Sequence, residues 1–357
     1  MAPKIYFLLG IAAAPIGLVL LHFFKKMFLQ LGVVDRPGQG KVHTEPKVTM
    51  LGIPMYIAAG IVFITYIFVS SQNSINYFAL FYFVGLTLCF LLGVVDDIFH
   101  IRALMKVIPL LAISLFASLY VSRVSVISIP FWGVFVLPES TAVIITTMWF
   151  FIVISAVNII DGIDGLLGSF AISYFSACLI IALMTGSSAT IFYALFSVSI
   201  VSVYMLYNFP PAEVFMGNSG SHLIAYLVAT VPFVERGFGN SLINVAPYLV
   251  MLTYPLIDIS ISLLRRFLGK VNVFSRDIHH IHHMLVRSFG DERKTLKFFI
   301  GLFSTNAFMA VTLVIMNHTL RVLSFFAYVI LNVAFSLFFA IRYSPGRKST
   351  GENSARE

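Results

Sequence analysis

The sequence predicts an all-α integral membrane protein, a polytopic bundle of about eleven transmembrane helices. Of its 357 residues, 59% are hydrophobic and only 11% are charged, and the mean hydropathy is +0.95. Soluble domains are roughly 45–50% apolar and about 25% charged. Uncharged runs near or above the ~20 residues that cross a bilayer divide the chain, and they lack the alternation of barrel strands. These observations exclude a cytosolic enzyme, a secreted disulfide scaffold and a disordered chain.

Each helix is expected where the chain carries an uncharged run. Residues 5–24 form the first run, and Lys25 and Lys26 follow it. A signal peptide carries its positive charge before the apolar stretch, so we expect a retained span. The run 48–95 is too long for one helix and breaks at 70–74, which predicts two. The other spans are expected at 107–122, at 140–160, twice within 165–212 with a break at 186–188, at 219–232 as a short span, at 242–264, at 298–317 and at 322–341.

The distribution of basic residues predicts the orientation of the bundle. With the N-terminus outside and eleven crossings, 19 of the 23 lysines and arginines lie on the inner side, as expected for cytoplasmic loops. The C-terminus is then cytoplasmic. Residues 124–137 alternate like strands around Pro130 and Gly133 and predict a short extracytoplasmic β-hairpin. We expect one transmembrane domain over 1–342 and a polar, disordered tail over 343–357. The net charge of +8 is explained by the basic loops, so we expect no nucleic-acid partner.

Two aspartates, Asp96 and Asp97, end the third predicted span. Adjacent carboxylates repel each other, so a pair at the membrane edge favours a bound cation. Magnesium takes one or two carboxylates together with substrate phosphates. Two solvated residues at a helix end are the alternative.

A second polar cluster occupies residues 158–165, between two predicted spans. Asn158, Asp161 and Asp164 recur at every third position, which places them near one helical face if the helix continues. Carboxylates and an amide suit hydroxyl groups, a nucleobase edge or a metal. A plain loop is the alternative, but so short a connection rarely needs two acids, so we favour a functional site.

Residues 216–221 open the short eighth span and include Gly217, Asn218 and Ser219. Two glycines and two serines at a helix N-terminus can form a nest of N–H donors for phosphate. An ordinary helix cap is the alternative and, taken alone, the better explanation. Asp258, late in the ninth span, has Arg265 two helical turns along the same side. Asp258 can be explained as a functional carboxylate or as half of a charge-compensated structural pair with Arg265, and both explanations remain open.

The inner segment 270–297 is rich in histidine. Four of its residues are histidines within five positions: His279, His280, His282 and His283. Imidazole can bind a metal, donate to phosphate or shuttle protons. A zinc site would require cysteine or wider spacing, so with Arg265 and Arg276 nearby we expect an anion clamp. A basic face on anionic lipid is the alternative. Lys41 and His43 lie in a basic, turn-rich first loop, for which an ordinary inner loop is the alternative.

These polar clusters come from separate inner connections and share one membrane face. They combine carboxylates, a phosphate nest and a cationic histidine loop. This set suits magnesium-assisted phosphoryl transfer at the inner surface, and the lipid-lined setting indicates that one substrate is an amphiphile.

The same motifs resemble those of the polyprenyl-phosphate N-acetylhexosamine-1-phosphate transferases, in their WecA/TagO-like branch. The resemblance runs from Asp35 to about Phe289. Its motifs, in family order, are Asp35-Arg36-Pro37 with Lys41 and His43, then Asp96-Asp97, 158–165, 216–221, Asp258, and His280-Ile281-His282-His283. The related muramoyl-pentapeptide transferases carry a different histidine run, so the resemblance points to UDP-GlcNAc as the donor.

The resemblance implies that undecaprenyl phosphate attacks the sugar-linked phosphate of UDP-GlcNAc at the cytoplasmic face of the bacterial inner membrane, and that UMP leaves. The product would begin a cell-envelope polysaccharide, such as lipopolysaccharide O-antigen or teichoic acid. Mg²⁺ would be the cofactor, with Mn²⁺ able to substitute, and a homodimer the assembly. The implied catalytic residues are Asp96, Asp97, Asp161 and Asp164, and the first two also hold the metal. The implied substrate-binding residues are Lys41, His43, Asn158, Arg265, Arg276, His280, His282 and His283.

One position departs from the family pattern. The family motif is Met-Gly-Asp-x-Gly-Ser, and its aspartate is a magnesium ligand, whereas this chain has Asn218 there. An amide keeps the shape but loses the charge, so metal affinity should fall. An engineered inactive variant, a natural variant with compensation and a degenerate homologue all explain this. Because the other motifs are intact, we favour the engineered variant.

Three rival functions remain open. A muramoyl-pentapeptide transferase performs the same chemistry on another donor. A transporter would place its acids near the bilayer midplane, whereas here they gather at one surface. A catalytically dead lipid-phosphate or nucleotide binder is kept open by Asn218.

Overall fold

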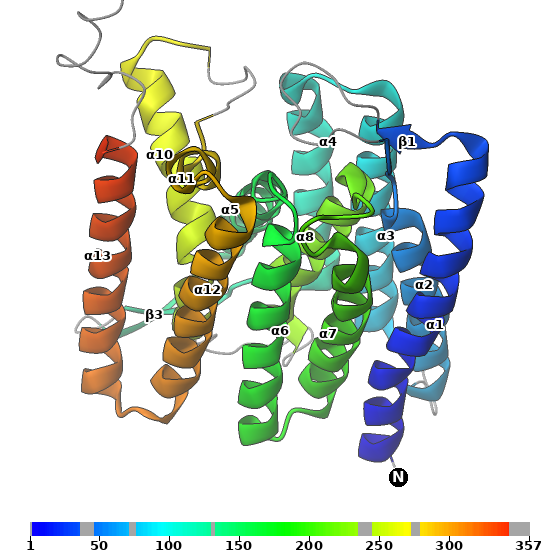
Figure 1. The fold of residues 1–357 in the computed structure, drawn as a ribbon. Helices are drawn as coiled ribbons and strands as arrows, with labels where there is room; N and C mark the ends of the chain where they lie inside the picture. Colours follow the sequence, from blue (N-terminus) through cyan, green and yellow to red (C-terminus); the bar gives the residue numbers. More distant parts are fainter. Residues whose placement is uncertain are drawn as a thin grey trace, which may run out of the picture.

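The protein is a bundle of long helices, as predicted (Figure 1). The computed structural model describes residues 2–35, 46–70, 76–129, 133–234, 245–272 and 279–342. Within these ranges, nine helices are long and apolar enough to cross a membrane. The all-α membrane class is therefore confirmed. The predicted tail, 343–357, lies outside the described residues.

Most of the predicted spans coincide with single helices. These are α1 (Ala2–Leu31), α2 (Gly52–Ser70), α3 (Tyr77–Phe99), α4 (Ala103–Phe116) with the π-helical turn η1 (Ala117–Val121), α5 (Glu139–Ile159), α6 (Leu166–Thr185), α7 (Ser188–Asn208), α12 (Glu292–Ile315) and α13 (His318–Arg342). The short predicted span at 219–232 is α8 (Gly217–Val234).

Two segments differ in detail from the prediction. The expected span at 242–264 is divided into α9 (Ala246–Met251) and α10 (Thr253–Leu268), which meet at Leu252. Pro255 explains the division, because it has no N–H to donate to the carbonyl four residues earlier. The histidine-rich segment, expected as a loop, contains the nine-residue helix α11 (Ile281–Phe289).

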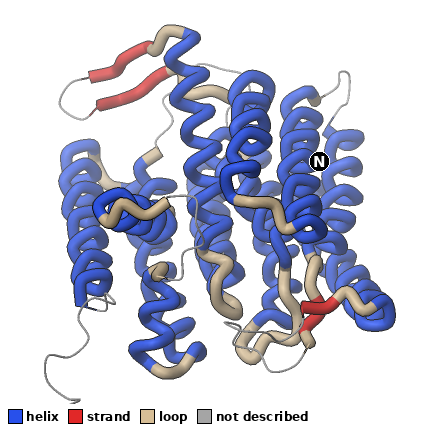
Figure 2. The backbone as a smooth tube through the Cα atoms, turned by 90° about the horizontal axis from the view of Figure 1, so that it is seen from above, coloured by secondary structure: helices blue, strands red, loops and turns tan. Residues whose placement is uncertain are grey.

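Two small antiparallel strand pairs accompany the helices in the part of the chain that the structure describes. The hairpin predicted within 124–137 is confirmed as β3 (Val126–Ile129) and β4 (Gly133–Val136), and it lies at the edge of the molecule (Figure 2). The other hairpin pairs β1 (Val34–Asp35) with β2 (Lys47–Val48). Val48 also forms a bridge to Val214, which attaches this hairpin to the segment before α8.

The centre of the bundle is α8, which contacts α3 and α5 over much of its length. Every residue from Ser219 to Val234 is buried. Two glycines on neighbouring helices allow its first turn to come close. A Cβ at Gly93 of α3 would overlap the Asn218 carbonyl, and one at Gly52 of α2 would overlap the Gly220 backbone. The start of α8 is therefore held directly beside the end of α3.

Candidate functional site

The predicted polar clusters gather at the end of the bundle opposite the N-terminus of α1 (Figure 1). The end of α3, the end of α5, the start of α8 and the helix α11 contribute to this end. The chain runs up and down between these helices, so segments far apart in sequence meet there.

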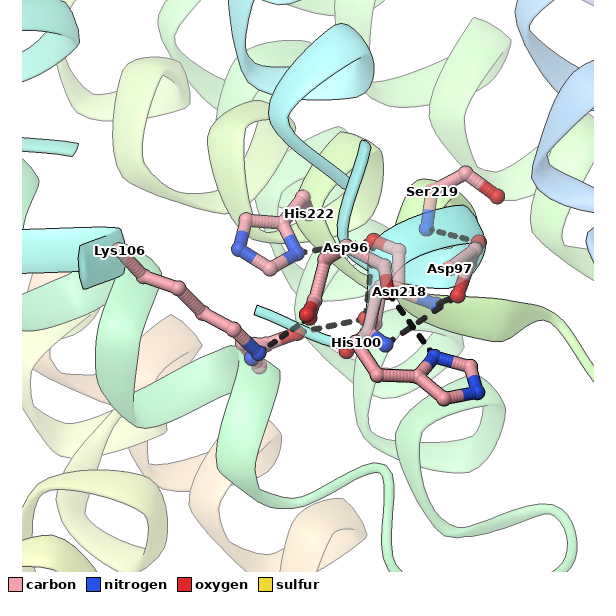
Figure 3. Close-up of polar contacts among 9 residues, drawn as sticks. Asp96, Asp97, His100, Lys106, Asn218, Ser219 and His222 are labelled. Atoms are coloured by element: carbon pink, nitrogen blue, oxygen red, sulfur yellow. Dashed lines mark hydrogen bonds and ion pairs between the residues drawn. The ribbon is translucent and has the colours of Figure 1, made fainter. Parts of the chain in front are cut away.

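The carboxylate of Asp97 caps the first turn of α8 (Figure 3). Its Oδ1 accepts from the backbone N–H of Asn218 at 2.6 Å, and its Oδ2 accepts from that of Ser219 at 2.9 Å. Gly217 has φ +73°, and a Cβ there would lie 2.7 Å from Asp97 Oδ2. Only glycine allows both the positive φ and the close approach of the Asp97 carboxylate. The N–H groups that we expected to bind phosphate therefore donate to Asp97, and the cap alternative is correct for them.

The neighbouring Asp96 points elsewhere. Its carboxylate forms an ion pair with Lys106 of α4, and the residue is 2% exposed (Figure 3). Its backbone carbonyl accepts from the His100 N–H, which ends α3 in a left-handed C-cap. The two adjacent acids therefore serve different neighbours instead of forming a symmetric pair.

Asn158 lies at the end of α5 and connects this helix to α8. Its Oδ1 accepts from the Ser221 hydroxyl at 2.6 Å. His222 contacts the Asn218 carbonyl through Nδ1 at 2.8 Å. The helix α5 ends at Ile159, so our condition that Asn158, Asp161 and Asp164 share one helical face is not met.

Asp161 stands in the turn after α5, where its side chain is exposed. Desolvation by the surrounding protein, followed by the negative charges of Asp97 and Asp164, raises the pKa of Asp161 to about 7. The dependence on Asp97 shows that two of the predicted motifs are close enough to interact electrostatically. An accessible carboxyl group that titrates near neutral pH suits proton transfer.

Asp164 is part of an ionic network at the same end. Its Oδ2 accepts from the Ala212 N–H at 2.9 Å and lies 3.4 Å from Lys47 Nζ. Its own N–H donates to Glu292 at the start of α12. Asp164 therefore connects the turn after α5 to three other parts of the chain. These are β2, the residues that precede α8, and the start of α12.

The histidine segment is held by α10. Asp258 accepts from the His280 ring at 2.8 Å and from the Ile281 N–H at 2.8 Å. Arg265 donates to the His279 carbonyl at 2.8 Å. Asp258 and Arg265, for which a structural pair was one of two alternatives, therefore both hold the histidine segment.

His282 brings the histidine segment against the turn after α5 that contains Asp161 and Asp164, here called the acidic turn. The ring is fully buried, and its Nδ1 lies 3.1 Å from the Tyr254 hydroxyl. A Cβ at Gly162 would overlap its Nε2, so only glycine leaves room for the ring. The ring of His283 lies 4.3 Å from that of His282. The structure therefore brings these two motifs into contact.

The predicted site residues and those found at this end of the bundle do not match completely. Lys41, His43 and Arg276 lie outside the described residues. Lys47, Lys106 and Tyr254 were not singled out by the sequence. Tyr254 precedes Asp258 by one helical turn, a spacing that could have indicated it. For the two lysines no sequence signal separates an ion-pair partner from an ordinary inner-loop charge.

The donor atoms beside Asp97 fit a magnesium ion that is completed by substrate. Among the described residues, no group of three or more His, Cys, Asp and Glu side chains could hold a metal ion. Magnesium needs only one or two carboxylates when phosphates and waters complete its shell. Asp97 supplies a carboxylate. The Asn218 Nδ2 donates to Asp97 Oδ1 at 3.2 Å, so the amide oxygen is the Asn218 atom that would hold a metal.

Comparison with known proteins agrees with this arrangement. The model of glycosyl transferase family 4 matches residues 78–234. A Thermotoga maritima protein named undecaprenyl-phosphate alpha-N-acetylglucosaminyl 1-phosphate transferase is 31% identical over 259 residues, 72% of this chain and 74% of the relative. An Escherichia coli protein of the same name is 27% identical over 304 residues, 82% and 76% of the two chains. A Bacillus subtilis protein, named as a probable undecaprenyl-phosphate N-acetylglucosaminyl 1-phosphate transferase, is 25% identical over 271 residues, 75% and 74%. The chain therefore belongs to glycosyl transferase family 4, in its branch of polyprenyl-phosphate N-acetylhexosamine-1-phosphate transferases.

Proposed function

We propose that this protein transfers GlcNAc-1-phosphate from UDP-GlcNAc to undecaprenyl phosphate at the cytoplasmic face of the bacterial inner membrane. An oxygen of the lipid phosphate bonds to the sugar-linked phosphorus, the bond from that phosphorus to UMP breaks, and UMP leaves. The observation that carries the proposal is the meeting of Asp97, Asp161 and His282 at one end of the bundle.

The charge distribution of the site supports a division of roles. We assign Asp97 and Asn218 to the metal, which would be Mg²⁺ or Mn²⁺ and would neutralise the diphosphate charge. Asp161 can accept a proton from the lipid phosphate at its carboxylate, since its pKa of about 7 lies close to neutral pH. We assign His280, His282 and His283 to the sugar-diphosphate of the donor. Asp96 is committed to Lys106, so we propose that it acts by holding α3 and α4 together.

Asn218 lowers the negative charge beside Asp97. Its amide donates to Asp97 Oδ1, a position where an aspartate would place a second negative charge. Two such carboxylates repel each other unless a cation lies between them. We therefore propose that the chain, as it stands, is a variant of low activity in which the amide replaces part of the cation's role.

The proposal is tested by UMP release from purified protein with undecaprenyl phosphate and each UDP-sugar, with and without magnesium. We expect Asn218→Asp to raise the rate with UDP-GlcNAc by about tenfold or more, which is ~1.4 kcal/mol of transition-state stabilisation. We also expect Asn218→Asp to melt at a lower temperature than the parent in EDTA and to recover in magnesium. Asn218→Ala is the control, because it removes the amide and adds no carboxylate.

The rival functions predict different outcomes. Equal rates for the parent and Asn218→Asp would remove this position from the metal site. UMP release only with UDP-MurNAc-pentapeptide would indicate the muramoyl-pentapeptide reaction. Binding of UDP-GlcNAc without turnover in either form would indicate a dead binder, and counterflow in liposomes would indicate a transporter.

A further inference from the structure

We infer that Asp258 is a positioning residue that holds His280 in one tautomer and one orientation, and that α10 acts as the frame of the histidine segment. This inference rests on the proposed function, in which His280 contacts the sugar-diphosphate of the donor. Neither the family match nor the names of the relatives assigns a role to Asp258.

Both oxygens of the Asp258 carboxylate are used. Oδ2 lies 2.8 Å from His280 Nδ1, and Oδ1 accepts from the Ile281 N–H at 2.8 Å. Asp258 is 1% exposed and His280 is 8% exposed. His280 is the N-cap of α11, but its own side chain makes no capping hydrogen bond. Asp258 supplies that cap from another helix, so one carboxylate sets both the start of α11 and the adjacent ring.

The contact determines where the imidazole proton lies. A carboxylate with two hydrogen-bond donors facing it accepts from both. His280 Nδ1 must therefore carry a hydrogen. In this tautomer Nε2 has a lone pair, so it can accept a hydrogen bond from a hydroxyl group of the donor's sugar. A carboxylate behind a histidine orients the ring of many metal and catalytic sites in the same way.

Further contacts along α10 hold the rest of the segment in register. Tyr254 and Asp258 are four residues apart, and Arg265 follows seven residues later, so the three lie toward one side of the helix. They contact His282, His280 and the His279 carbonyl in turn. The rings of His280 and His282 are consequently parallel, with centroids 5.6 Å apart and an interplanar angle of 1°.

The frame also connects α10 to the acidic turn. The buried ring of His282 lies against Gly162, next to Asp161. A loss of the Asp258 contact should therefore displace His280 first and disturb the turn only through His282. We expect the effect to fall mainly on the KM for the UDP-sugar.

The direct test is nitrogen NMR of the protein labelled with ¹⁵N-histidine, with His280→Gln used to assign the signal. In Asp258→Asn, one carboxylate oxygen becomes an NH₂ donor, so the His280 signal should lose its Nδ1–H tautomer. In the Asn218→Asp background, the same change should raise the KM for UDP-GlcNAc about tenfold or more. Ser260→Ala is the matched control on α10, since its hydroxyl only donates to the Leu256 carbonyl of its own helix.

A double-mutant cycle keeps the inference testable if Asp258→Asn is unstable. His280→Gln alone leaves the Asp258–Ile281 bond available, and Asp258→Asn should raise KM little further in that background, because the two residues act as a unit. An unchanged His280 signal in Asp258→Asn, or fully additive effects on KM, would overturn the inference. If the signal changes as expected but no form releases UMP from any UDP-sugar, the tautomer assignment is supported and the proposed function fails.

Discussion

At the scale of single residues, the site depends on atoms placed where only one residue type fits. Asp161 combines an exposed side chain with a pKa near neutrality, and Gly162 leaves room for a histidine ring. Each feature leads to an experiment on one side chain.

The raised pKa of Asp161 predicts a pH dependence of stability. Its pKa is about 7 in the folded protein, compared with the ordinary value of 3.8 that applies to the unfolded chain. Between these values the folded protein binds the proton that the unfolded chain releases, so stability falls as the pH rises from about 4 to 7. We expect the melting temperature in EDTA to decrease more between pH 5 and pH 8 for the parent than for Asp161→Asn. Parallel profiles for the two proteins would contradict the shifted pKa.

Gly162→Ala should impair the site with a modest cost in stability. The new Cβ would overlap His282 Nε2, and Tyr254 limits how far that ring can move. We expect UMP release in the Asn218→Asp background to fall about tenfold or more, ~1.4 kcal/mol. Gly301→Ala is the control, since nothing lies within 4 Å of a Cβ there. Equal losses in the two variants would show that the effect is not specific to the site.

At the scale of elements, the helices are connected at the site by polar contacts between ends. Asp97 joins α3 to α8, Asp258 joins α10 to α11, and Lys106 joins α4 to α3. Each contact pairs polar groups that would lose free energy if they were left without a partner. The ends of the helices are therefore held in position at the site.

The pair of Lys106 and Asp96 can be tested by removing its charges in turn. Lys106→Met leaves a carboxylate with 3% of its side chain exposed and no ion-pair partner. We expect a loss of about 2 kcal/mol, less than the ~3–5 kcal/mol for a fully buried pair, because Lys106 is partly exposed. Adding Asp96→Asn should restore most of the stability, as measured by thermal melting. If the double variant is stable yet inactive in the Asn218→Asp background, Asp96 has a chemical role beyond the pair.

At the scale of the whole molecule, successive helices run in alternating directions, so the bundle has two ends that carry different elements. The β3–β4 hairpin precedes α5, and the acidic turn follows it, so a helix of 21 residues lies between them. At 1.5 Å per residue such a helix is long enough to span the hydrocarbon core.

Cysteine labelling can determine which end faces the cytoplasm. Cys89 and Cys178 are buried and should react slowly. We expect a membrane-impermeant thiol reagent applied to intact cells to label Val136→Cys in β4 and to leave Ser288→Cys in α11 unlabelled until the membrane is broken. The opposite pattern would place the site on the outer side, and labelling of both in intact cells would show that the two ends do not lie on opposite sides.

The class of the protein and most of its helix positions followed from the sequence alone. Helix formation and burial in a bilayer depend on local composition, and the uncharged runs carry that information. The hairpin at 124–137 and the polar clusters at residues 158–165 and 279–283 were likewise visible in local patterns. Asn218 was recognised only because the surrounding motif resembled a family, since an asparagine at a helix start is otherwise an ordinary cap.

The partners of the charged groups were decided by the tertiary structure. Asp96 and Asp97 are adjacent in sequence, yet one faces Lys106 and the other the first turn of α8, because the C-terminal turn of α3 directs consecutive side chains apart. Asp258 pairs with a histidine 22 residues away, a contact that depends on the return of the chain past α10. Local patterns specify which residues are polar, whereas the packing of distant segments determines which polar groups meet.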